Sequence, residues 1–89
     1  MHRPPCGEPF VSTCRFDVEG LASADLPLRV LNLFAQQGIV VDAVEVRRRG
    51  DHHAITTVAD LPVDRATVIL EKIRSLVLVA GAELSRADQ

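Results

Sequence analysis

The chain has 89 residues, 47% of them hydrophobic, and its 10 basic and 12 acidic side chains give a net charge of -2. A chain of this length forms one domain, and it lacks the clustered positive charge that favours nucleic acid, so we expect no nucleic-acid partner. It also lacks an apolar run of the ~18–20 residues that span a bilayer and a signal-peptide h-region, which predicts a cytoplasmic protein without a membrane partner.

The first ten residues are rich in residues that interrupt helices and strands, namely Pro4, Pro5, Gly7 and Pro9. This composition predicts a flexible N-terminal tail over residues 1–10, followed by a single domain over residues 11–89. The two cysteines, Cys6 and Cys14, are too few for a disulfide framework and lack histidines at zinc-finger spacing. We therefore expect reduced thiols and no bound metal.

The first expected element is a strand from about Val11 to Leu21. Apolar and charged side chains alternate along it, in the order Cys14, Arg15, Phe16, Asp17, Val18 and Glu19. Period-two alternation predicts one buried and one exposed face. Small residues then predict a loop from Gly20 to Asp25.

A helix is expected to follow this loop, with Asp25 as its N-cap. Pro27 falls in the first turn, where the missing N–H of proline has no cost. The helix is predicted to end at about Gln37, because Gly38 is a natural stop in left-handed geometry.

The second half of the chain predicts a hairpin, a helix and a final strand. The hairpin is expected to consist of strands from about Val40 to Arg48 and from about His53 to Val58, joined by a turn at Arg49, Gly50 and Asp51. A helix is expected from Pro62 to about Leu76, and the final strand from about Val79 to Ser85.

The order strand, helix, strand, strand, helix, strand predicts an α+β class protein with the ferredoxin-like βαββαβ fold. Two right-handed crossovers place both helices on one face of a four-stranded antiparallel sheet. The other face is left open, and the side chains expected there are Arg15, Asp17, Glu19, Ala43, Glu45, Arg47 and Glu83. The edge strands carry open hydrogen-bonding groups, so edge-to-edge dimerisation is expected.

No arrangement of catalytic residues or of cofactor ligands stands out, so we expect neither enzymatic activity nor a cofactor. His52 and His53 are adjacent, which sends them to opposite faces of a strand, and exposed turn residues are the simplest interpretation. The run Arg47, Arg48 and Arg49 has two interpretations. It is either a site for a phosphate or carboxylate, or a set of charges that keeps a hairpin end soluble.

Two segments resemble ACT domains, and most closely the small regulatory subunit of acetolactate synthase. Residues 31–41, which read LNLFAQQGIVV, resemble the first helix and second strand of that family. Residues 71–79, EKIRSLVLV, resemble the end of its second helix. The likeness covers about residues 12–86 and is carried mainly by core-forming positions.

The resemblance implies an effector site at a dimer interface, formed by the loop after the first strand and by the neighbouring second strand. The matching positions here are Ala22, Ser23, Ala24, Asp25, Val41 and Asp42. Ala24 and Asp25 depart from the family, which usually has Pro and Gly there, and the Asp25 carboxylate would repel an effector carboxylate.

The resemblance therefore implies a non-catalytic, homodimeric regulatory subunit or amino-acid-sensing module. Its expected partners are a larger catalytic subunit and a small amino acid effector. The alternative is a stand-alone protein–protein interaction module that has lost effector binding.

Overall fold

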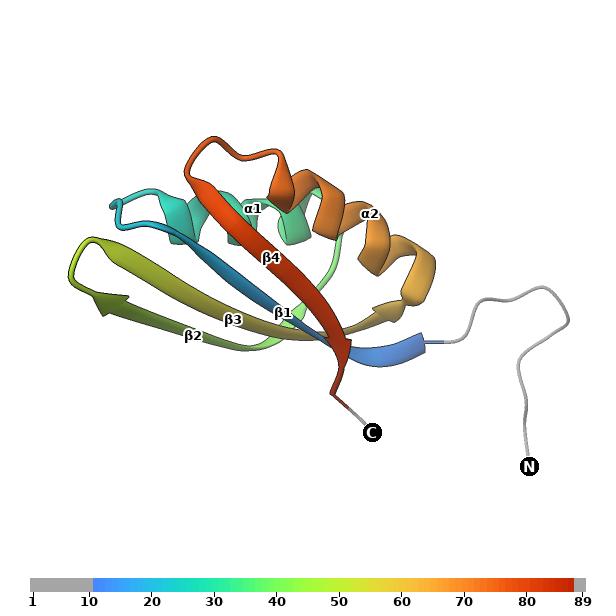
Figure 1. The fold of residues 1–89 in the computed structure, drawn as a ribbon. Helices are drawn as coiled ribbons and strands as arrows, with labels where there is room; N and C mark the ends of the chain where they lie inside the picture. The colour runs from blue at the N-terminus through green and yellow to red at the C-terminus, as the bar shows by residue number, and fades with distance from the viewer. Residues whose placement is uncertain (1–10, 88–89) are drawn as a thin grey trace, which may run out of the picture.

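The computed structural model describes residues 11–87, so the predicted tail over residues 1–10, with Cys6, lies outside the described part. Six elements follow one another along the chain (Figure 1): β1 Val11–Leu21, α1 Leu26–Gln36, β2 Val41–Arg49, β3 His52–Pro62, α2 Val63–Arg74 and β4 Val79–Arg86. This is the predicted βαββαβ order.

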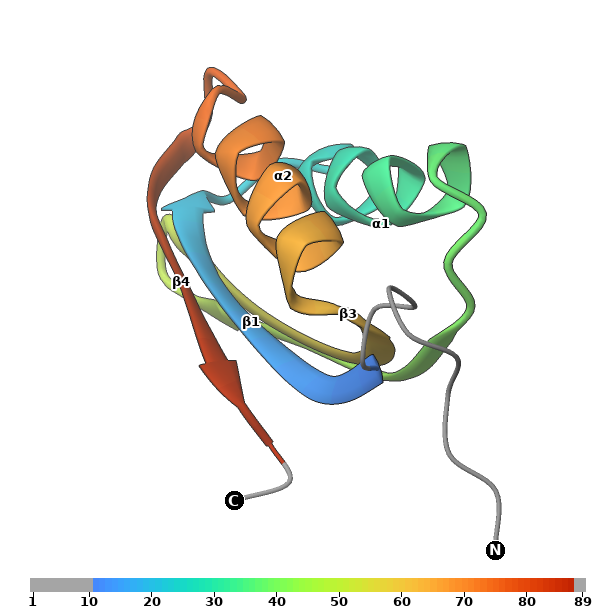
Figure 2. The ribbon, with the colours of Figure 1, turned by 90° about the vertical axis from the view of Figure 1, so that its right-hand side faces the viewer.

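The four strands form one antiparallel sheet in the order β2-β3-β1-β4. Both helices lie side by side over the same face of this sheet (Figure 2). The ferredoxin-like fold expected from the sequence is confirmed. β2 and β4 are its two edge strands.

The central strand β1 separates the two faces of the sheet. Its side chains at Cys14, Phe16 and Val18 are buried under the helices, as the alternation predicts. Residues paired across the strands share a face, so the strand register identifies the open face. All seven side chains expected there lie on it: Arg15, Asp17, Glu19, Ala43, Glu45, Arg47 and Glu83.

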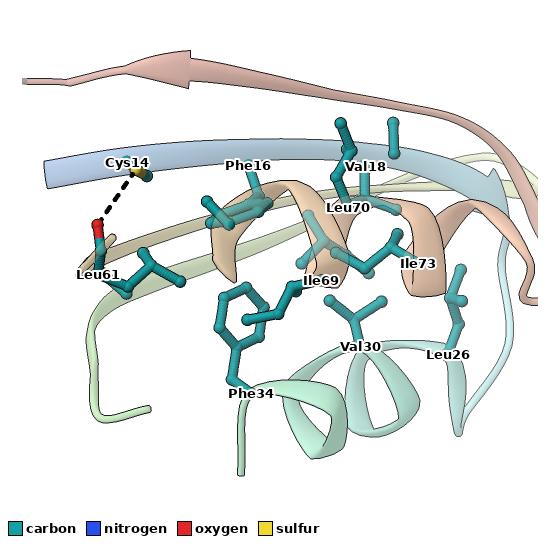
Figure 3. Close-up of a cluster of buried hydrophobic side chains, with 14 residues drawn as sticks. Cys14, Phe16, Val18, Leu26, Val30, Phe34, Leu61, Ile69, Leu70 and Ile73 are labelled. Atoms are coloured by element: carbon teal, nitrogen blue, oxygen red, sulfur yellow. Dashed lines mark hydrogen bonds between the residues drawn. The ribbon is translucent and has the colours of Figure 1, made fainter. Parts of the chain in front are cut away.

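The core between the helices and the sheet is mainly aliphatic, with one aromatic contact (Figure 3). The rings of Phe16 from β1 and Phe34 from α1 meet edge to face, with their centroids 5.0 Å apart. The Cys14 thiol is buried beside them and donates to the Ser12 carbonyl oxygen at a sulfur–oxygen distance of 3.6 Å. This thiol fills core space in β1, as expected.

Helix α1 ends as the sequence predicts. Gly38 has a φ of 71°, and its N–H donates to Ala35 O at 3.0 Å. The N–H of Ile39 donates to Phe34 O, also at 3.0 Å. These two bonds form a Schellman motif, which satisfies carbonyls at the helix end and turns the chain towards β2.

Several predicted boundaries were wrong near the strand ends. β1 ends at Leu21, as expected for the first strand, but the loop predicted to start at Gly20 begins only after Leu21, because Gly20 and Leu21 pair with the start of β3. β3 runs to Pro62 rather than Val58, since its pairing with β1 continues to the Val11–Pro62 pair. Pro62 is therefore extended, with a ψ of 146°, and precedes α2 instead of opening it.

Candidate functional site

The loop between β1 and α1 is held against the end of the β2–β3 hairpin. The N–H of Ala22 donates to Asp51 O at 2.8 Å. The N–H of Ser23 donates to His53 Nδ1 at 3.3 Å. The loop that the sequence singled out is thus fixed by residues about thirty positions further along the chain.

A hollow of about 360 Å³ lies between this loop and the hairpin, and we call it the loop hollow. It is lined by Ala22, Ser23, Ala24, Arg48 and His53. None of these five residues carries a carboxylate, and the Arg48 guanidinium contributes a full positive charge. The loop hollow therefore favours a negatively charged group.

Two residues of the loop hollow, Arg48 and His53, were not among the predicted site residues. They pair with each other across β2 and β3, on the side of the sheet that faces the helices. One interpretation of the run Arg47, Arg48 and Arg49 was a phosphate or carboxylate site, but nothing in the sequence linked Arg48 to His53 or to the loop after β1. The hairpin register supplies that link, because it places both residues beside the end of β1.

The two histidines lie on opposite faces, as expected, but both belong to β3 rather than to the turn, and only His52 is exposed. His52 pairs with Arg49 on the open face, and its Nδ1 lies 2.9 Å from Asp51 Oδ1. His53 is half-buried and accepts the Ser23 N–H, so its ring helps to shape the loop.

Asp25 occupies the N-cap position of α1, but its side chain does not cap the helix, which corrects the sequence-based interpretation. Its Oδ2 accepts a bond from Arg29 Nε at 2.9 Å, one turn along the helix. Its Oδ1 accepts a short bond from the Ser23 hydroxyl. The bond from Ser23 and that from Arg29 lower the pKa of the Asp25 carboxyl from 3.8 to about 2.

This arrangement changes the role expected for Asp25. The carboxylate is ionised at neutral pH, but Arg29 supplies the compensating charge. Asp25 itself does not line the loop hollow. The repulsion expected between this residue and a bound anion is therefore weakened, since its charge is directed to α1.

Within one chain, Val41 and Asp42 lie far from the other predicted site residues. Val41 pairs with Ala59, six positions along β3 from His53. At ~3.3 Å per residue, this separation is roughly 20 Å. Asp42 lies at a β-bulge, where the β2–β3 register shifts, and its side chain is exposed. The predicted six-residue site is therefore not assembled within a single copy.

The two edges of the sheet differ in how their backbones are occupied. On β4, Arg74 donates two bonds to Ala82 O, from Nε at 3.1 Å and from Nη2 at 2.9 Å. Within residues 11–87, the backbone of β2 makes no bond outside its ladder with β3. β2 is therefore the freer edge for another strand.

Apolar side chains accompany the β2 edge. Val44 and Val46 lie on the side of β2 that faces the helices, but they are 41% and 43% exposed. The helices cover β1 and β3 more completely than they cover β2, which leaves an apolar flank beside a strand with open hydrogen-bonding groups.

In the described part of the chain, no group of three or more His, Cys, Asp or Glu residues is placed to hold a metal ion. None of its helices has the length and apolar character needed to cross a membrane.

Comparison with known proteins places these features in a family. The model of the ACT-like domain family matches residues 10–89. A search of curated proteins finds no match. The ACT domain of GTP pyrophosphokinase from Chlorobium tepidum has a TM-score of 0.76 at 9% identity, and the match covers 85% of this chain and 100% of that chain.

Two larger structures contain a similar domain. The match to homoserine dehydrogenase from Thiobacillus denitrificans has a TM-score of 0.75 at 16% identity and covers 89% of this chain but 18% of that chain. The regulatory subunit of aspartate kinase from Thermus thermophilus gives 0.66 at 18%, with coverages of 88% and 53%. The TM-scores establish a common fold. The family model matches nearly the whole sequence, so the chain belongs to the ACT-like domain family.

Proposed function

We propose that this protein is a non-catalytic regulatory ACT domain that acts as a homodimer paired through β2. In this proposal the loop hollow binds the anionic end of a small effector, and the dimer controls a larger catalytic subunit. The observation that carries the proposal is the unoccupied β2 edge with exposed Val44 and Val46 beside it.

The contrast between the edges supports β2 as the dimer interface. An exposed strand edge tends to pair with another strand, and a protein prevents this by blocking the edge or charging it. Arg74 occupies backbone on β4, whereas nothing in residues 11–87 does so on β2. Pairing at β2 would also remove Val44 and Val46 from water, which is favourable.

The predicted site residues support the same interface. When two identical strands pair antiparallel, the start of each lies beside the end of the other. Val41 and Asp42 open β2, and Arg48 is its penultimate residue. A second copy paired through β2 would thus bring its own Val41 and Asp42 towards the loop hollow, which a single chain cannot do.

The chemistry of the loop hollow supports an anionic effector. Arg48 offers a guanidinium to a carboxylate, and the polar loop around Ser23 lies beside it. The resemblance of residues 31–41 to the small subunit of acetolactate synthase makes valine, leucine and isoleucine the first effectors to test. By the same resemblance, a catalytic subunit of branched-chain amino acid synthesis is the first partner to test.

A second function is favoured by one observation, the carboxylate of Asp25 at the start of α1. In the family this position usually holds Gly, whereas here it carries a carboxylate next to the loop that lines the hollow. A dimer that binds no amino acid would instead act as a stand-alone protein–protein interaction module.

The test of dimerisation is the mass in solution, measured by sedimentation for the wild-type chain, Val46→Lys and Val68→Lys. Val68 lies on α2 and is 48% exposed, which makes it a matched control. We expect the wild type and V68K to be dimers and V46K to be monomeric. A monomeric wild type at micromolar concentration would contradict the proposal.

The test of effector binding is thermal denaturation with each of the twenty amino acids, for the wild type and for Arg48→Gln. A ligand at a hundredfold excess over its dissociation constant stabilises a protein by about 2.7 kcal/mol. We expect a branched-chain amino acid to raise the melting temperature of the wild type but not of R48Q. Arg15→Gln, on the open face, is the control that should keep the response. A stable dimer whose melting temperature does not change with any amino acid would support the alternative, a protein–protein interaction module.

A further inference from the structure

We infer that the two copies pair in one particular register, centred on Val46, in which Glu45 of each copy lies opposite Arg47 of the other. This inference rests on the proposed dimer and specifies its interface.

Only a few registers are compatible with a symmetric antiparallel pair. Side chains on one face of one strand must meet side chains on the same face of the other, so the two-fold axis passes through a residue position. The bulge at Asp42 disturbs the start of β2, and a centre near either end shortens the paired stretch. The central candidates are therefore Glu45, Val46 and Arg47.

The charges select among these three centres. A centre at Glu45 places two carboxylates directly opposite each other, and a centre at Arg47 does the same with two guanidiniums. Like charges opposite each other destabilise a strand pair, whereas opposite charges stabilise it. A centre at Val46 places Glu45 opposite Arg47 twice, once on each side of the axis. In this register both charged residues therefore face a residue of opposite charge.

The side-chain geometry within one copy is compatible with ion pairs between Glu45 of one copy and Arg47 of the other. Arg47 Nε donates to Glu45 Oε2 at 2.8 Å, and the two side chains are 61% and 58% exposed. This bond uses Nε, so the two Nη atoms of Arg47 remain available to the carboxylate of the second copy. The Glu45–Arg47 pairs can then form a four-membered network on the open face.

The opposite face of the pair is apolar in the same register. Val46 of one copy meets Val46 of the other, and Val44 lies opposite the aliphatic stem of Arg48. Exposed Val46 thereby becomes covered on the axis of the dimer. Apolar contact on one face and ion pairs on the other both favour this register.

The register also determines what reaches the loop hollow. With Val46 at the centre, position 42 of one copy lies beside position 50 of the other. Gly50 and Asp51 form the hairpin turn, and Asp51 O accepts the N–H of Ala22. Asp42 of the second copy therefore arrives next to the loop that lines the hollow, where it adds a carboxylate suited to an ammonium group.

The test is a charge exchange between two variants of the full chain, Glu45→Arg and Arg47→Glu. Each variant alone places like charges opposite each other, so we expect its dimer dissociation constant to rise about tenfold or more. An equimolar mixture should form a heterodimer, because every opposing pair is again Glu with Arg. The double variant E45R/R47E should recover the homodimer. Native mass spectrometry distinguishes these species, since the two variants differ in mass.

The control is Arg15→Glu, which reverses a charge on β1 of the same open face and should leave the dimer intact. Formation of the heterodimer shows that both variants are folded. If E45R and R47E dimerise as well as the wild type, the register is wrong although the proposed dimer stands. A monomeric wild type would instead overturn the proposed function itself.

Discussion

Replacing Thr57 with valine is expected to stabilise this protein. Thr57 lies in the middle of β3, is fully buried, and its Oγ1 is the one buried side-chain N or O atom of the described residues without a hydrogen-bond partner. It pairs with Phe16 on β1 and with Val44 on β2, so its hydroxyl faces the core. A buried polar group without a partner costs about 1–3 kcal/mol.

Valine has nearly the shape of threonine and is equally suited to a strand, so the change removes the hydroxyl without opening a cavity. We expect T57V to raise the free energy of unfolding by about 1 kcal/mol, the lower end of that cost. For a domain of this size, this corresponds to a rise in melting temperature of about 4–8 °C.

The assay is urea unfolding followed by circular dichroism, together with a thermal melt. The matched control is Thr56→Val, at the neighbouring position on the open face. Thr56 Oγ1 donates to Asp17 Oδ1 at 3.0 Å, so its removal should lower stability by about 0.5–1.5 kcal/mol. If T57V is less stable than the wild type, the Thr57 hydroxyl has a partner in the core and the reasoning is refuted.

Two further predictions concern the loop and its surroundings. Gly20→Ala should destabilise the fold by about 1–3 kcal/mol in urea unfolding, because its Cβ would lie 2.3 Å from Leu78 O. Gly81→Ala, where a Cβ meets nothing within 4 Å, should change stability by less than about 0.5 kcal/mol, and equal effects at both sites would contradict this. The pKa of Asp25 is lowered from 3.8 to about 2 in the folded state, so its contribution to stability is complete above about pH 4 and is lost as the pH falls towards 2. Asp25→Asn should make the melting temperature less dependent on pH over that range. If the variant keeps the pH dependence of the wild type, the bonds from Ser23 and Arg29 do not stabilise the fold.

The order of the elements and the two faces of the sheet follow from local patterns in the sequence. The alternation around Phe16 and the position of Gly38 are local signals, and each was confirmed by the structure. Such signals work because strand pleating, helix periodicity and left-handed backbone geometry depend on residues close together in the chain. The charged residues of the open face followed from the same alternation.

The residues that form the candidate site are brought together only in the tertiary structure. That Arg48 and His53 line the loop hollow together with the loop after β1 depends on which strands lie side by side. The position of Val41 at the far end of β2 likewise follows from the strand register. These contacts join residues distant in sequence, so no local pattern encodes them.

The ends of β3 show the same division within the fold. Pro62 carries a valid local signal for a helix start, because proline is favoured in the first turn of a helix. Its pairing with Val11 overrides that signal and keeps it extended. Local preference predicts a helix that begins at Pro62, but the pairing of β3 with β1 sets the actual end of β3. Each residue pair added to this ladder contributes hydrogen bonds that an isolated segment cannot form.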